Sequence, residues 1–285
     1  FSNFGYSLDL LAPGDEVLST WANGSYVRSG GTSMSAPVVS GAAALLCAAF
    51  PQWNSRQVAE QLKISSDRID TLPQNKPWEH KLGAGRLNML KALTQGGKPA
   101  LVLNEIQLDC RGTGFFQPGD TVLLSGILMN YLAAANAVNL SLSSESESVR
   151  VIHSEKQVGP LPGLASYSLS GQPFVMEITS HAKINEKGLL KLQIDADGLI
   201  RDQYILFTIN SDMINLETQD IKVSFRSEGS VGTPGDGFIK AHGFTYRQGG
   251  QLLAEAGFVL GISPEMVLDN IRGAEGDSVE FVTKQ

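Results

Sequence analysis

The sequence contains few cysteines. Cys47 and Cys110 are the only two among 285 residues, so few that cysteine usage says little about the compartment. They fall in segments that we expect to belong to different domains, so no disulfide between them is predicted. Cys47 lies in a stretch of small apolar residues and is interpreted as a core residue.

Long hydrophobic runs are also scarce. The densest run, residues 36–50, is interrupted by Pro37, Ser40 and Gly41, and on this pattern we predict no membrane span. The sequence opens on Phe1, without the basic n-region and apolar h-region of a signal peptide. We therefore expect the chain to start in the middle of a domain.

Positive charge is under-represented. The chain carries 22 Lys and Arg against 29 Asp and Glu, a formal net charge of −7. Residues 1–96 hold eight basic and seven acidic side chains, and residues 97–285 hold fourteen and twenty-two. A nucleic acid or an anionic membrane would require a basic surface, so neither is an expected partner.

Apolar and turn-forming residues, in contrast, are plentiful. Hydrophobic residues make up 42% of the chain, enough for a packed core, and the length allows more than one domain. The 30 glycines and 12 prolines favour many short strands and turns over long helices.

The first 96 residues alternate between strand and helix signals. Apolar runs at 8–11 and 16–20 predict short strands that end at turns. A long helix is expected from about Ser33 to Phe50, with Pro37 in its first turn, where a missing N–H costs least. Its small side chains predict that this helix is buried.

Two further helices are expected in the same region. Asn54 is a predicted N-cap, and Gln57 stands three residues later, the spacing of a capping box. The segment "KLGAGRLNMLKAL" predicts a turn and a last helix. The composition of "TQGGKPA", residues 94–100, is typical of a linker.

From Leu101 the hydrophobic period changes to two, which indicates strands. The regular spacing of these strands favours an immunoglobulin-like β-sandwich over residues 97–212. "DADG" at 195–198 predicts a tight hairpin turn rather than a calcium loop, because the twelfth position holds Leu206 instead of Glu. Residues 213–285 are predicted to form a partial third β-rich module. The expected strands are 121–129, 138–142, 149–152, 174–178, 189–194, 204–209 and 221–225.

The stretch "GGTSMSAPVVSGAAALL", residues 30–46, contains a candidate nucleophile, Ser33. Gly30 and Gly31 leave room for another chain to approach its hydroxyl. The amino terminus of a helix presents free N–H groups that suit the oxyanion of acyl transfer. The alternative from helix chemistry alone is that Thr32 and Ser33 are N-caps.

This stretch resembles the serine-nucleophile block of subtilisin-like serine proteases. The resemblance extends over residues 1–93, in the order "FSNFG", "LDLLAPGDEVLST", the serine block, "WNSRQVAEQL" and "GAGRLNMLKAL". It implies the carboxyl-terminal part of an α/β catalytic domain, a partial three-layer parallel sheet truncated at its amino terminus.

The resemblance also implies roles for the matching residues. Ser33 corresponds to the nucleophile, and its backbone N–H to one oxyanion-hole donor. Thr32 supports that hole, and Met34 follows the nucleophile as in the family. Ser29, Gly30 and Gly31 line the leaving-group side of the cleft. Asp9 matches a position near a cation site in some members, so calcium is a possible cofactor, and an exposed aspartate at a strand edge is the alternative.

In subtilisin the triad order is Asp, His, Ser. The activating His, the orienting Asp and the side-chain amide of the oxyanion hole are therefore expected before Phe1. None of the four histidines, His80, His153, His181 and His242, stands in the His-Gly-Thr context of the family, and each is interpreted as a surface or turn residue. Asp70 and His80 would fit the Ser…Asp…His order of α/β-hydrolases, but residues 31–35 are not a G-x-S-x-G elbow.

Together these observations predict a fragment of a secreted or cell-surface bacterial serine endopeptidase that acts on polypeptides and is inactive as given. Two alternatives stay open. The parent protein could be a non-catalytic scaffold whose β modules serve adhesion or substrate binding, or the acidic β region could be a secretion or surface anchor. The sequence does not determine the oligomeric state.

Overall fold

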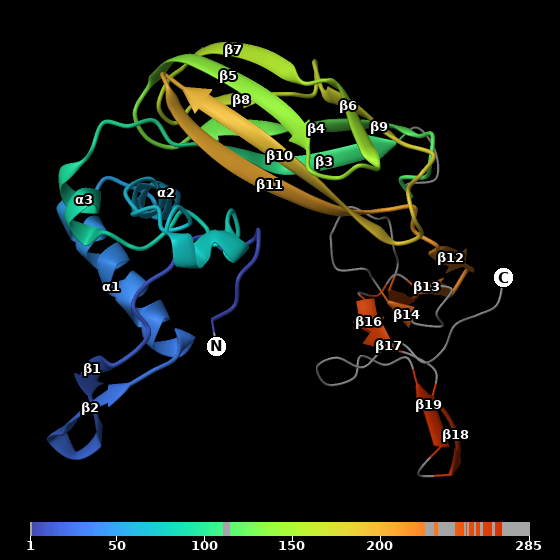
Figure 1. Ribbon diagram of the computed structural model, residues 1–285, viewed down its shortest axis with the longest axis horizontal. Coiled ribbons are helices and arrows are strands. Elements are labelled where there is room, and N and C mark those ends of the chain that lie inside the picture. The colour runs from blue at the N-terminus through green and yellow to red at the C-terminus, as the bar shows by residue number, and fades with distance from the viewer. Residues whose placement is uncertain are drawn as a thin grey trace.

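The structure is a computed structural model that describes residues 2–110, 115–225, 231–232, 243–247, 249, 251–253, 255–256, 259–263 and 266–269. A largely helical region at the amino terminus is followed by two antiparallel sheets and then by shorter strands (Figure 1). His242 and residues 226–230, 233–242 and 270–285 of the predicted third module lie outside the described residues. The boundaries expected after residues 96 and 212 stay predictions.

The helices of the first region form where local signals predicted them. Asn54 caps α2 as expected: its side chain accepts from the Gln57 N–H at 3.0 Å, and the Gln57 side chain accepts from the Asn54 N–H at 3.1 Å. The elements are β1 (Val17–Thr20), η1 (Ala22–Gly24), β2 (Tyr26–Ser29), α1 (Thr32–Ala49), α2 (Ser55–Ile64), η2 (Pro73–Trp78) and α3 (Met89–Thr94).

The expected three-layer parallel sheet is not found in the described part of this region. β1 and β2 form an antiparallel hairpin, and the expected strand at 8–11 is reduced to an isolated parallel bridge between Leu11 and Arg86. The backbone bonds continue from Ala84 N–H to Asp9 and from Leu87 N–H to Leu11, at 2.8 and 2.7 Å. A parallel sheet requires neighbouring strands, and the described residues supply this one pairing.

The prediction that α1 is buried is wrong for this chain. Only Ala42 and Leu46 of α1 are buried, because α2 and α3 cover one face of the helix. Cys47, expected in the core, is exposed, and no disulfide joins Cys47 to Cys110. Pro37 lies five residues after Thr32, in the second turn instead of the first.

Helix α1 bears on the expectation about membrane spans. Among the described residues it is long and apolar enough, by length and composition, to cross a bilayer. The helix includes residues 32–35 in addition to the apolar run that begins at residue 36, which brings its length to 18 residues. Core helices of soluble proteins pass the same test, so length and composition assign no span here.

The second region consists of two antiparallel sheets. One has the strand order β11-β10-β5-β7, and the other has the order β3-β4-β9-β6, with β8 also paired to β4. Each strand expected between 121 and 209 is present. The strands are β3 (Leu101–Cys110), β4 (Thr121–Asn130), β5 (Ala135–Ser144), β6 (Val149–His153), β7 (Glu155–Leu161), β8 (Ser166–Ser168), β9 (Phe174–Ile178), β10 (Glu186–Ala196) and β11 (Leu199–Ile209).

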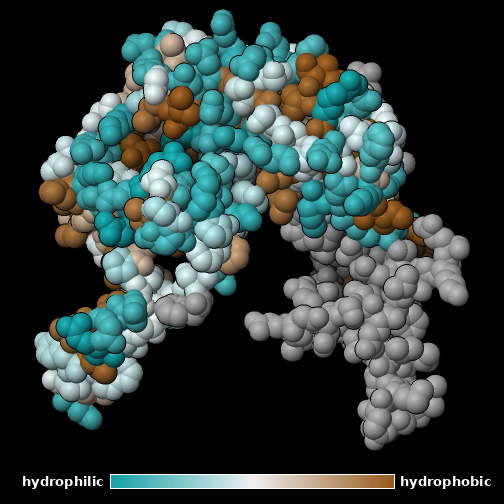
Figure 2. All heavy atoms as spheres, in the orientation of Figure 1, coloured by the Kyte–Doolittle hydropathy of each residue, from teal (hydrophilic) through white to brown (hydrophobic). Residues whose placement is uncertain are grey.

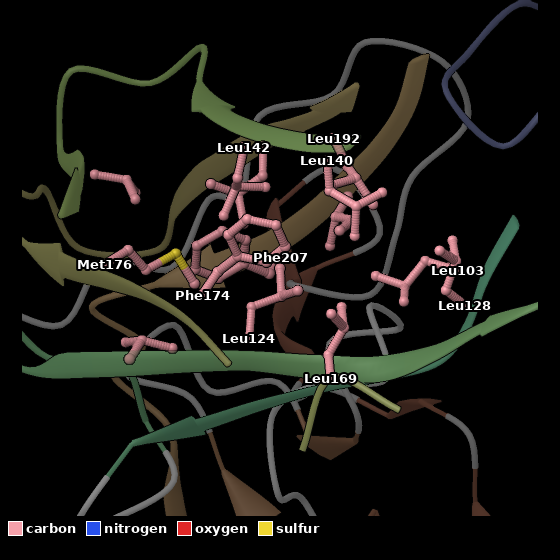
Figure 3. Packing of buried hydrophobic residues seen from close by; sticks show 14 of the residues in the cluster. Leu103, Leu124, Leu128, Leu140, Leu142, Leu169, Phe174, Met176, Leu192 and Phe207 are labelled. Atoms are coloured by element: carbon pink, nitrogen blue, oxygen red, sulfur yellow. The ribbon is translucent and has the colours of Figure 1, made fainter. Parts of the chain in front are cut away.

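The two sheets share one hydrophobic core, because alternate side chains of each strand point inward. Figure 3 shows Phe174 and Met176 from one sheet against Phe207 and Leu142 from the other. The predicted tight turn joins β10 and β11, where Asp197 and Gly198 have φ values of 54° and 84°.

Residues 94–100, whose composition is typical of a linker, are hydrogen-bonded to the sandwich at Ala100. The buried Asn130 side chain accepts from the Ala100 N–H at 3.2 Å and donates to the Leu161 carbonyl at 3.0 Å. The Ala100 carbonyl accepts from the Tyr131 N–H at 2.8 Å. The connection between the two regions is therefore fixed by hydrogen bonds at its sandwich end.

The third region contains shorter strands. The expected strand at 221–225 is β13, which pairs with three other strands. The described elements are β12 (Ile214–Glu217), β13 (Ile221–Phe225), β14 (Val231–Gly232), β15 (Phe244–Tyr246), β16 (Gln251–Leu253), β17 (Glu255–Ala256), β18 (Val259–Ser263) and β19 (Met266–Asp269).

Candidate active site

Ser33 is the second residue of α1 and is exposed. Within the part of the chain that the structure describes, its hydroxyl makes no hydrogen bond. The carbonyl of Ser33 has no donor at the position four residues on, because Pro37 has no N–H. Because the Ser33 side chain is exposed and its hydroxyl has no hydrogen-bond partner among the described residues, it can meet a base and a substrate from outside this helix.

Glycine sets the path of the chain into Ser33. Gly31 precedes α1 with φ 135° and ψ 159°, a conformation that residues with a side chain rarely adopt. Its N–H donates to the Gly14 carbonyl at 2.7 Å. A Cβ on Gly14 would lie 2.2 Å from Ser35 Oγ and 3.0 Å from the Gly31 oxygen, so the Pro-Gly turn packs directly under the start of the helix.

The amino terminus of α1 has no side-chain cap. Gly31 occupies the N-cap position, and Thr32 and Ser33 already lie inside the helix. The alternative that these two hydroxyls serve as N-caps is therefore not seen. A free helix start favours negative charge, which is what an oxyanion beside Ser33 would bring.

The other residues implied by the resemblance surround this helix start. Ser29 ends β2, is half-buried and pairs with Val17. Thr32 and Gly30 are exposed, and Met34 is half-buried with its N–H bonded to the Gly31 carbonyl at 2.9 Å. All of them lie within four residues of Ser33, and the chain path through Gly31 determines their arrangement.

None of the described histidines forms a hydrogen bond with Ser33. His80, His153 and His181 are exposed, as predicted, and His242 lies outside the described residues. The Ser…Asp…His alternative has no support, because Asp70 is bonded to Arg68 at 2.9 and 3.3 Å. That hydrogen bond is the largest cause that lowers the pKa of Asp70. No hydrogen bond in the described chain joins Ser33 to Asp70 or His80.

Sequence reasoning missed the residues that hold the end of this region. Gly83 and Gly85 have φ values of 59° and 114°, and a Cβ on Gly85 would lie 2.1 Å from the Asp67 oxygen. The Asp67 carboxylate binds Lys91 at 2.6 Å, Asn88 at 3.0 Å and Arg86 at 3.2 Å. These bonds, that of Lys91 first, lower the pKa of Asp67 from 3.8 to about 2. The Gly-x-Gly spacing was the signal that could have revealed this close approach.

Asp9 does not suit a calcium ion. Its side chain is 78% exposed, and its carboxylate lies 3.3 Å from the ammonium of Lys63. Calcium requires six to eight oxygen ligands, whereas a cation already faces this carboxylate. Among the described residues, no group of three or more His, Cys, Asp or Glu side chains is placed to hold a metal ion.

The comparisons with known proteins concern the region around Ser33. The model of the subtilase family (Peptidase_S8) matches residues 1–85. Subtilisin from Bacillus pumilus and Subtilisin E from Bacillus subtilis (strain 168) are each 44% identical over 66 residues, 23% of this chain. Subtilisin BL from Lederbergia lenta is 44% identical over 69 residues, 24% of this chain. Residues 1–85 are thus a subtilase-like segment, similar to a serine-protease family.

The matched part is short on both sides. It spans 24%, 17% and 26% of the lengths of these three relatives. Among solved structures, Escherichia coli alpha-2-macroglobulin from domain MG7 to the C-terminus aligns with 50% of this chain and 21% of that chain, at 14% identity and a TM-score of 0.30. A TM-score this low supports no argument about fold or function.

Proposed function

We propose that this chain is part of a serine endopeptidase that hydrolyses peptide bonds through an acyl-enzyme on Ser33. The observation that supports this most directly is the position of Ser33. It is an exposed hydroxyl in the first turn of an uncapped helix, within the subtilase-like segment. The substrate would be a polypeptide.

In this proposal each residue near Ser33 has one role. The Ser33 oxygen attacks the scissile carbonyl, and the Ser33 N–H donates to the oxyanion that forms. Thr32 supports that donor, and Met34 packs beside it. Ser29, Gly30 and Gly31 line the leaving-group side, where missing side chains leave room for the substrate.

The base is not among the residues around Ser33. In the subtilisin order, Asp and His precede Ser, and the 32 residues before Ser33 in this chain contain no histidine. We therefore propose that the base and its orienting Asp belong to preceding sequence of a longer protein. Without them Ser33 stays a weak nucleophile, because triad members act as a unit.

We also propose three finer assignments. The region of two sheets is an immunoglobulin-like domain, which its two antiparallel sheets and shared core support. The domains span 1–96, 97–212 and 213–285, and separate buried clusters support the first boundary. The parent protein is bacterial and secreted or at the cell surface, as the similarity to bacterial subtilisins suggests.

A serine-directed fluorophosphonate tests the proposal. The protein encoded by the complete gene is expected to be labelled at Ser33, and the chain of 285 residues to be labelled negligibly. Ser33→Ala in the complete protein should abolish labelling, whereas Ser40→Ala, an exposed serine on the same helix, should leave it unchanged. Strong labelling of the 285-residue chain would contradict the missing base, and no labelling of the complete protein would favour the non-catalytic scaffold.

A further inference from the structure

The edge strand β11 of the sandwich is in contact with the amino-terminal region. β11 is the last strand of its sheet and runs along the side that faces α2 (Figure 1). An uncovered edge strand is a site of unwanted pairing, and natural proteins cover or charge such edges. Here two side chains of β11, Arg201 and Tyr204, which lie on opposite faces of the strand, meet residues of the first region.

On the first face, Arg201 completes the surroundings of a buried carboxylate. The Glu60 side chain in α2 is 5% exposed and forms an ion pair with Lys63 of the same helix. Arg201 Nη1 lies 3.4 Å from Glu60 Oε2. Burying a carboxylate without enough partners costs free energy. Arg201 of the sandwich therefore stabilises the buried Glu60 carboxylate of α2.

On the opposite face, Tyr204 takes part in an aromatic cluster. Its ring lies 4.9 Å from that of Tyr6 and 5.6 Å from that of His80. The ammonium of Lys81 lies over the Tyr6 ring at 5.5 Å. Burial is the largest cause that raises the pKa of the Tyr204 hydroxyl well above its ordinary value. Tyr204 is half-buried, and its ring is in contact with residues of the first region.

Charge complements these contacts. Residues 1–96 have a net charge of +1 from eight basic and seven acidic side chains, and residues 97–285 have −8. Asp202 of β11 lies between the two contacts and bonds Lys191 at 3.2 Å. The pKa of Arg68 is raised first by its hydrogen bond with Asp70, and Asp202 and Tyr204 add to this rise. Asp202 of the sandwich thus acts on Arg68 of the first region, whereas the Arg201–Glu60 pair has the opposite polarity.

We propose that Arg201, Asp202 and Tyr204 of β11 form a docking surface for the subtilase-like segment of the same chain, so that the two regions unfold as one unit. The partner is α2 together with the loops around Tyr6 and His80. Figure 1 shows the amino-terminal end of α1 on the side of the first region away from the sandwich. Docking on β11 therefore leaves the surroundings of Ser33 open.

Hydrogen exchange on the complete 285-residue chain tests the docking surface. Tyr204→Ala is expected to speed amide exchange in residues 55–81 about tenfold or more, while amides of β5 and β10 stay protected. Leu206→Ala is the matched control, because Leu206 is an exposed residue of the same strand two positions along. Equal exchange in residues 55–81 for Tyr204→Ala and the unchanged chain would overturn the proposal.

A second pair of variants guards against damage to the sandwich itself. Tyr6→Ala removes the same aromatic contact from the other side, and it should reproduce the effect of Tyr204→Ala on residues 55–81. Arg201→Gln should lower the Tm of the joint unfolding transition by about 5 °C, and Glu60→Gln combined with Arg201→Gln should lower it by less than the sum of the single changes. Strict additivity, or separate melting of the two regions in the unchanged chain, would refute docking.

Discussion

The amino-terminal region and the sandwich differ in how completely they bury their apolar residues. In the described chain, the sandwich core contains twenty-six buried hydrophobic residues from both sheets and their connections, some of which are drawn in Figure 3. The core of the first region contains five, namely Ala42, Leu46, Val58, Leu62 and Ala92. Both regions have regular elements, but only the sandwich has a second layer opposite each apolar face.

The exposed side of the first region shows the consequence. Leu45 and Leu90 are 55% and 72% exposed, and Figure 2 shows hydrophobic side chains at the surface where α1 and α3 lie. Leu18, Trp21 and Tyr26 of the β1–β2 hairpin are also exposed. Local signals are thus enough to form a helix or hairpin, whereas burial requires a neighbouring layer. An exposed apolar face of this kind promotes association.

The largest effect is expected in the sandwich core. Phe207→Ala removes a ring that is fully buried and lies 5.5 Å from Phe116. We expect a loss of about 3–5 kcal/mol in the free energy of unfolding of the sandwich, measured by urea denaturation. Leu46→Ala in α1 is the matched change in the smaller core, and we expect a loss near the lower end for such a change, about 2 kcal/mol, because its surroundings can collapse. Equal losses would remove the contrast between the two cores.

A smaller effect is expected where the sandwich holds the connection between the regions. Asn130→Ala leaves the Ala100 N–H and the Leu161 carbonyl buried without this partner. We expect a loss of about 1–3 kcal/mol in the free energy of unfolding. Asn139→Ala, at an exposed position on β5, should change it by less than about 0.5 kcal/mol. A neutral Asn130→Ala would show that the connection needs no such anchor.

The first region should lose stability in acid through Asp67. Its folded pKa, about 2, is below the unfolded value of 3.8. The contribution of Asp67 is therefore fully present above about pH 4 and is lost as the pH falls toward 2. This loss is measured as the fall in the urea midpoint of unfolding between pH 5 and pH 2, with amide exchange in α3 as the probe of the first region. In Asp67→Asn the urea midpoint should depend less on pH. In Glu147→Gln, which alters an exposed carboxylate of the sandwich, the pH dependence of the midpoint should be unchanged.

The smallest change in stability is expected on the exposed face of α1. Leu45→Lys should leave the free energy of unfolding of this chain within about 0.5 kcal/mol and should reduce self-association measured by light scattering. A loss above about 1 kcal/mol would mean that Leu45 is covered in solution. The same substitution in the complete protein would then report what covers this helix.

Much of the local structure could be predicted from the residues alone. Three features depend only on neighbours a few positions away and could therefore be predicted from the sequence. They are the capping box at Asn54 and Gln57, the turn at Asp197-Gly198 and the alternation of buried residues in β9. The exposure of Cys47 and the lack of a parallel sheet among the described residues could not be predicted in this way. Both depend on which elements pack against α1 and against residues 8–11, and those contacts are absent from the described residues.

For the site, the sequence by itself determined the identity of the candidate nucleophile, because Gly30, Gly31 and Ser33 belong to one continuous stretch. Only the tertiary structure decided that Gly14 lies under Ser35 and that Gly85 lies against Asp67. It likewise decided that Arg201 reaches Glu60 across 141 positions of the chain. The physical reason is that the free energies of backbone conformation and of helix capping depend on residues that are close in the sequence. Close backbone contacts and ion pairs, in contrast, form between segments that are distant in the sequence and that only the fold brings together.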